Sequence, residues 1–136
     1  MSRSNYSEDW GDNDWGFIRW RGAVTSAIKG RRGQAFLRDL ITALDAMPRK
    51  ELIAYEFQQD NEVCALGALG LARGLDLGSV DPEEPDRVAN LFGIATALAQ
   101  EVVYQNDEGA WYVESPEDRW KRMRAWAVSH LQGEAP

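Results

Sequence analysis

Cysteine and histidine are almost absent from this chain of 136 residues, which contains only Cys64 and His130. A single cysteine cannot form an internal disulfide, and this usage is typical of a reducing compartment. One cysteine and one histidine are too few for a structural zinc site, and no carboxylates follow the spacing of a calcium loop. We therefore predict that the protein binds neither a metal ion nor a cofactor. We also predict that it is located in the cytoplasm.

Long hydrophobic runs are missing as well, since no segment approaches the roughly 20 apolar residues that span a bilayer. No membrane association is predicted. The chain also lacks a phosphate-binding glycine loop and a serine-nucleophile motif. Cys64 would need a nearby base to act as a nucleophile, whereas the only histidine lies near the C-terminus. The sequence thus indicates no catalytic residue, favours a non-catalytic protein, and predicts that Cys64 is buried.

What the chain does contain is enough apolar sequence for one domain, with 44% hydrophobic and 27% charged residues. Residues 1–17 are polar and acidic without a helical or strand period, so we predict an N-terminal tail and a globular domain over residues 18–132. Trp10 and Trp15 in this tail either hold it against the domain or contact a partner.

Apolar periodicity and terminal signals predict helices over residues 18–28, 34–47, 66–73, 86–92, 94–105 and 115–131. A glycine-rich break is expected at 30–33. Residues 52–57 and 63–65 read as two short strands joined by a polar turn. Such a hairpin is marginally stable alone and must lie on helices. The predicted fold class is therefore mostly helical α+β, with five or six helices packed around a short antiparallel hairpin.

The segment 60–74 is predicted to lie at the centre of this fold, with Cys64 at the hinge between hairpin and helix. Gly67 is expected to admit another backbone at close range. Replacing Cys64 by Ser should then cost stability, because it adds a buried hydroxyl. Asn106 and Asp107 are predicted to form a turn that ends a helix, with a small polar pocket beside Gly67 as the alternative.

Charge is unevenly distributed along the chain, whose net charge is −7. Residues 19–50 carry eight basic and two acidic residues, whereas residues 51–136 carry six basic and sixteen acidic ones. This asymmetry marks either a basic contact face or two halves of one domain that attract each other. The candidate anion-binding residues are Lys29, Arg31 and Arg32, although solvated charge gives the same pattern. The acidic candidates for partner binding are Asp81, Glu83, Glu84 and Asp86.

Two short motifs stand far apart in the sequence. The first consists of Cys64, Leu66, Gly67, Ala68 and Leu69, and the second of Asn106, Asp107 and Gly109. Their order resembles a loose group of small uncharacterised phage, prophage and bacterial proteins, over about residues 24–131. The chain departs from that group in having Gln105 before Asn-Asp and a tryptophan-containing acidic N-terminus. The resemblance implies a mostly helical domain in a phage or prophage setting, and no activity.

From the resemblance and the acidic charge we expect a non-catalytic protein that binds and modulates a host protein in the host-cell cytoplasm. An inhibitor of a bacterial defence complex, of the anti-CRISPR kind, is one form of this function. The alternative is a nucleotide- or nucleic-acid-handling domain that acts through the Arg31 and Arg32 region and the Asn106-Asp107 turn.

Overall fold

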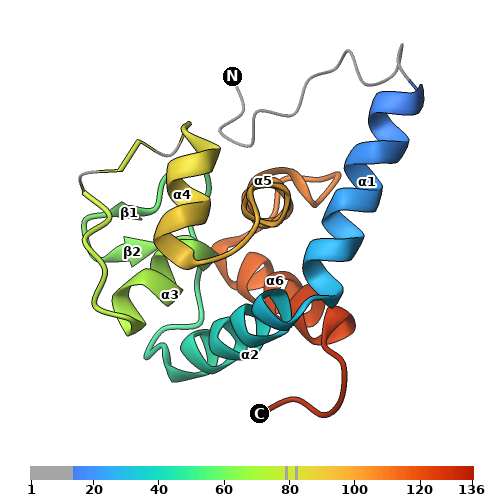
Figure 1. The fold of residues 1–136 in the computed structure, drawn as a ribbon. Coiled ribbons are helices and arrows are strands. Elements are labelled where there is room, and N and C mark those ends of the chain that lie inside the picture. Colours follow the sequence, from blue (N-terminus) through green and yellow to red (C-terminus); the bar gives the residue numbers. More distant parts are fainter. Residues whose placement is uncertain (1–13, 79, 82) are drawn as a thin grey trace.

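The computed structural model describes residues 14–136 except residues 79 and 82. Within them the fold is mostly helical α+β, with six helices and one two-stranded antiparallel hairpin (Figure 1). The helices are α1 (Asp14–Lys29), α2 (Arg31–Ala46), α3 (Ala65–Ala72), α4 (Pro85–Phe92), α5 (Thr96–Glu108) and α6 (Pro116–His130). The strands are β1 (Gln58–Gln59) and β2 (Glu62–Val63). The predicted fold class is confirmed, and no helix of the described part is long and apolar enough to cross a membrane.

The core is built around α2, whose apolar stripe was the clearest helical pattern in the sequence. Its buried side chains are Phe36, Leu37, Leu40, Ile41, Ala43 and Leu44. Val24 and Ile28 of α1 join the same core, as do Met123 and Ala127 of α6. Complete burial of each large apolar side chain contributes about 1.5–3 kcal/mol. In Figure 1, α2 and α6 cross at the base of the molecule and the hairpin lies to one side, next to α3.

The first two helices are longer than predicted. Helix α1 begins at Asp14, so Trp15 lies in the helix rather than in a tail, while Trp10 falls outside the described residues. The predicted break after the first helix is present but shorter than 30–33, since only Gly30 separates α1 from α2. The reason is a close helix crossing at Gly33, where a Cβ atom would lie 1.9 Å from the carbonyl oxygen of Ala27. The missing side chain lets α2 start almost directly after α1.

The strand predicted over residues 52–57 is also wrong, because this segment is irregular and β1 begins only at Gln58. Only its ends bond to the hairpin region, through the N–H of Ile53 to the carbonyl of Val63 at 2.9 Å and the N–H of Cys64 to the carbonyl of Phe57 at 3.1 Å. Side chains from α5 and α6 satisfy other backbone groups of the segment. Arg119 Nη1 donates to the carbonyl of Leu52 at 3.0 Å, and Asn106 Nδ2 donates to that of Ile53 at 3.0 Å. Tyr55 has a φ of 71°, which no β-strand accommodates.

Ion pairs between distant segments only partly follow the charge asymmetry of the sequence. Arg21 pairs with the buried Glu101 at 3.0 Å, as attraction between a basic and an acidic half requires. In two other long-range pairs, the acidic residue comes from the basic segment 19–50 and the arginine from the acidic segment 51–136. These pairs are Arg73 with Asp39 at 2.7 Å and Arg124 with Asp45 at 2.6 Å. The hydrogen bonds from the Arg124 guanidinium lower the pKa of the Asp45 carboxyl below its ordinary value.

Candidate functional site

Cys64 is buried and caps the N-terminus of α3. Its Sγ accepts a hydrogen bond from the backbone N–H of Gly67 at 3.4 Å, the position that a serine hydroxyl normally occupies at an N-cap. The only histidine, His130, lies on α6 beside the ring of Trp126, at 5.1 Å between ring centroids. Cys64 therefore acts here as a helix cap and a core residue.

This geometry changes the expectation for Cys64→Ser. A hydroxyl at this position gains the Gly67 N–H as its donor, so we expect Cys64→Ser to lie within about 1 kcal/mol of the wild type. Cys64→Ala removes the cap and should cost about 1–2 kcal/mol. Urea unfolding of the three proteins checks the order. A serine variant less stable than the alanine variant would show that the cap contributes nothing.

The two sequence motifs meet in space at this helix end. Asn106 is buried, and its Oδ1 accepts a hydrogen bond from the N–H of Ala65 at 3.0 Å. Its Nδ2 donates to the carbonyl of Ile53 at 3.0 Å and to Asp107 Oδ1 at 2.9 Å. Asp107 Oδ1 also accepts from the N–H of Tyr55 at 2.9 Å. Asn106 thus joins α5 to the start of α3 and to the irregular segment before the hairpin.

The predicted turn at Asn106 and Asp107 is wrong, because both residues lie in the last turn of α5. The helix continues through them, and their side chains bond to distant backbone groups, the N–H of Ala65 and the N–H of Tyr55. The pocket considered beside Gly67 is not formed by Asn106 either. Its side-chain oxygen and nitrogen both bond within the protein.

A partly buried ion cluster around Glu114 continues this network, and no pattern in the sequence predicts it. Arg122 donates to both carboxylate oxygens of Glu114, at 2.9 and 2.6 Å, and Arg119 lies 3.3 Å from the same carboxylate. The two arginines also donate to the carbonyls of Gln105 and Asn106 at the end of α5. They therefore satisfy backbone acceptors that a helix C-terminus leaves open, and they fix the segment that follows α5.

That segment and Tyr55, from the irregular segment before β1, present a cluster of exposed apolar side chains, which we call the aromatic patch. It is defined as Tyr55, Trp111, Tyr112 and Val113. Trp111 is 94% exposed, Val113 is fully exposed, and the Trp111 and Tyr112 rings meet edge to face at 5.6 Å. The patch lines a shallow cavity of about 530 Å³ together with Asp107, Glu108, Ala110, Glu114 and Arg119. The patch was not predicted from the sequence, although the aromatic pair Trp111-Tyr112 between Gly109 and the cap of α6 is a visible signal.

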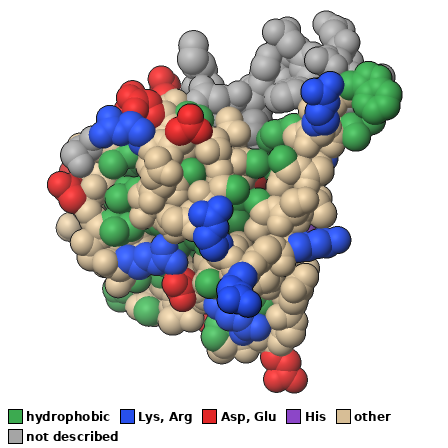
Figure 2. Space-filling model, viewed as in Figure 1, with side chains coloured by type: hydrophobic (Ala, Val, Ile, Leu, Met, Phe, Trp, Pro, Cys, Tyr) green, Lys and Arg blue, Asp and Glu red, His purple; other side chains and the backbone are tan. Residues whose placement is uncertain are grey.

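The acidic residues selected from the sequence surround the start of α4, and at least two of them have local structural roles. Asp81 Oδ1 accepts from the N–H of Glu83 at 2.9 Å, and Asp86 Oδ1 accepts from the Thr96 hydroxyl at 2.8 Å. Glu84 lies 3.5 Å from Arg87. Arg87 lies on α4 beside Asp86, and Figure 2 shows basic as well as acidic side chains on the face that it draws, so the acidic turn is not one field of a single sign.

The basic candidates are exposed at the corner between α1 and α2. Lys29 ends α1, and Arg31 and Arg32 open α2, whose N-cap Gly30 provides no side-chain hydrogen bond. These basic residues therefore lie on α1 and α2, whereas the acidic candidates lie around the start of α4 and Asn106 lies on α5. Trp15, the described member of the tryptophan pair, is 71% exposed near the start of α1.

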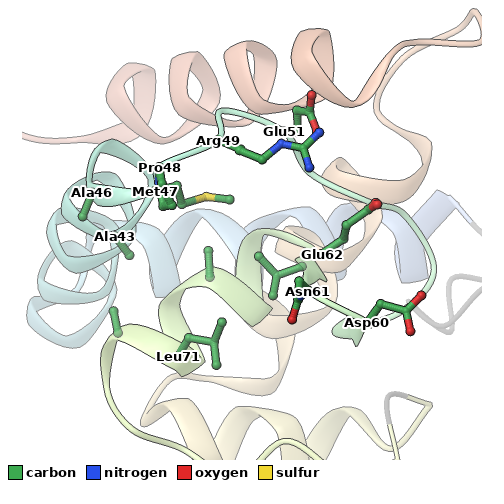
Figure 3. A pocket seen from close by; sticks show the side chains of 13 residues that line it. Ala43, Ala46, Met47, Pro48, Arg49, Glu51, Asp60, Asn61, Glu62 and Leu71 are labelled. Carbon is green, nitrogen blue, oxygen red and sulfur yellow. The ribbon is translucent and has the colours of Figure 1, made fainter.

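A second hollow, the α2–α3 groove, lies between the end of α2, the open side of α3 and the hairpin (Figure 3). Its volume is about 790 Å³. It is lined by Ala43, Ala46, Met47, Pro48, Arg49, Glu51, Asp60, Asn61, Glu62, Val63, Ala68, Leu71 and Ala72.

No protein-family model matches this chain, and no curated protein or solved structure resembles it significantly. Across the described part of the chain, no three His, Cys, Asp or Glu side chains are grouped so as to hold a metal ion.

Proposed function

We propose that this chain is a non-catalytic protein that binds and modulates a host protein, and that the aromatic patch is its contact surface. The observation that carries the proposal is a run of exposed apolar side chains, Trp111 to Val113, next to the buried Glu114, which two partly buried arginines hold. Exposed apolar clusters on a small domain mark interaction sites. Tryptophan and tyrosine are also the side chains that most often dominate binding energy.

The anchoring of the patch supports binding with little loss of freedom. Glu114 directly follows Val113 and is held by Arg119 and Arg122, while Tyr55 is held through its N–H by Asp107. The backbone that presents the aromatic rings is therefore ordered before a partner arrives. The entropic cost of association then comes mainly from immobilised side chains and not from the folding of a loop.

The charge around the patch favours a protein over a nucleic acid as partner. Its cavity is lined by the carboxylates of Asp107, Glu108 and Glu114 and by a single cation, Arg119. Stacking surfaces for bases are accompanied by a positively charged groove, because phosphate neutralisation supplies much of the affinity. The phage or prophage setting, and an anti-CRISPR-like role within it, are supported by the resemblance of the two motifs and by the net charge of −7.

The alternative function, nucleotide or nucleic-acid handling, relied on the basic Arg31 and Arg32 region and on the Asn106-Asp107 turn, and only the basic region still favours it. The side chain of Asn106 is occupied within the protein, so it does not contribute to nucleotide handling. Lys29, Arg31 and Arg32 remain exposed and suit a polyanion.

Affinity capture from host-cell lysate, with and without nuclease, tests the two functions together. We expect a protein partner that survives nuclease and whose binding falls at least tenfold in Trp111→Ala, about 1.4 kcal/mol or more. Trp15→Ala is the matched control, since it removes another exposed tryptophan. Binding that survives Trp111→Ala and disappears with nuclease, or in the Arg31→Ala/Arg32→Ala variant, contradicts the proposal and supports the alternative. Melting temperatures of all variants exclude unfolding as the cause.

A further inference from the structure

We propose that the α2–α3 groove is a second docking site, separate from the aromatic patch, and that it accepts a basic amphipathic helix of a partner protein. Three properties of its lining carry this inference: an apolar floor, small side chains along that floor, and an acidic edge.

The floor consists of side chains from two neighbouring helices. Ala43, Ala46 and Met47 come from α2 and the residue after it, while Ala68, Leu71 and Ala72 come from α3. Helix α3 is apolar on all sides, and its residues Ala65–Gly70 are buried, as is typical of a core helix. Leu71 on the same helix is nevertheless 55% exposed and faces the groove. An apolar side chain in that position is suited to contact a partner's apolar face.

The small size of the floor residues determines what can lie there. Four of them are alanines, whose short side chains leave open space above the floor between α2 and α3. Helices approach most closely where the side chains at their contact are small. A cavity of about 790 Å³ is large enough for several side chains of one helix face, which would enter at i, i+3 or i+4, and i+7.

The edge of the groove determines the charge of the partner. Glu51, Asp60 and Glu62 line it, and Arg49 is its single cation. Arg49 is already paired with Glu51 at 2.8 Å, so the negative charge of Asp60 and Glu62 dominates the hairpin side. Figure 3 shows these two carboxylates on the hairpin, opposite Met47 and Pro48. A helix with apolar residues toward the floor and lysine or arginine toward the hairpin complements both sides, whereas a nucleic acid would be repelled.

The test uses three fluorescein-labelled peptides of about 15 residues, near the length at which an isolated helix begins to be stable. The first has leucines at i, i+3, i+4 and i+7 with lysines on the flank. The second replaces the lysines by glutamates, and the third is a scramble of the first. By fluorescence anisotropy we expect the full chain to bind the first peptide at least tenfold more tightly than either other peptide. This affinity should fall as salt is added.

Two substitutions of equal charge locate the binding. Leu71→Lys should weaken binding of the first peptide at least tenfold, whereas Ile18→Lys on α1 should leave it unchanged, since Ile18 is 57% exposed and does not line the groove. Both positions are exposed, so both variants are expected to fold. Equal affinity for the three peptides, or equal effects of the two substitutions, would overturn the proposal. A wild-type dimer in sedimentation that becomes monomeric in Leu71→Lys would overturn it too, because the groove would then bind a second copy. None of these outcomes depends on Trp111, so the proposed function is tested separately.

Discussion

Gly67→Ala is expected to destabilise the domain by about 3 kcal/mol or more, or to prevent folding, although it adds a single methyl group. A Cβ atom on Gly67 would lie 2.0 Å from the carbonyl oxygen of Phe57 and 3.0 Å from the Cβ atom of Val63. The Phe57 carbonyl cannot easily move, because it accepts the N–H of Cys64 at 3.1 Å. Relief of the clash would therefore disrupt the start of α3 or its contact with the segment before β1. Urea unfolding measures the loss directly.

Gly22→Ala is the matched control for this substitution. Gly22 lies on the exposed side of α1, and a Cβ atom there would meet no atom within 4 Å. Alanine at an exposed helix position is favoured over glycine by about 0.5–1 kcal/mol, so this variant should be slightly more stable than the wild type. Similar unfolding midpoints for the two variants would contradict the close approach at Gly67.

Asn106→Leu is expected to cost about 3 kcal/mol or more of unfolding free energy. Leucine is of comparable size but apolar, so it leaves the N–H of Ala65 and the carbonyl of Ile53 without the partner that Asn106 provides. Each buried polar group that loses its hydrogen bond costs about 1–3 kcal/mol. Thermal or urea unfolding checks the prediction.

Asn90→Leu controls for the change of residue type. Asn90 is exposed on α4, so its replacement should alter stability by no more than about 0.5 kcal/mol. If Asn106→Leu proves as mild as Asn90→Leu, the network between α5, α3 and the Ile53 segment does not stabilise the fold. Amide hydrogen exchange at Ala65 gives a local readout, since this N–H should lose protection first in Asn106→Leu.

Those parts of the fold that depend on neighbouring residues could be predicted from the order of amino acids. The stripe from Phe36 to Leu44 repeats with the helical period, and α2 forms there because that period places every apolar side chain on one face. Ser115 and Pro116 start α6 as predicted, since the Ser115 hydroxyl accepts the N–H of Asp118 at 3.1 Å. In both cases the stabilising contacts join residues less than three turns apart.

Tertiary structure alone decided the features whose partners are distant in the chain. The carbonyls of Leu52 and Ile53 accept hydrogen bonds from Arg119 and Asn106, far along the sequence, and not from a neighbouring strand. Asn106 is of a residue type that favours turns, but it lies in a helix and its side chain bonds to backbone groups of distant segments. The aromatic patch likewise depends on Glu114, which fixes Trp111 to Val113 only when α6 brings two arginines to it. Hydrogen bonds and ion pairs of this kind leave no periodic trace in sequence, because they depend on which helices pack together.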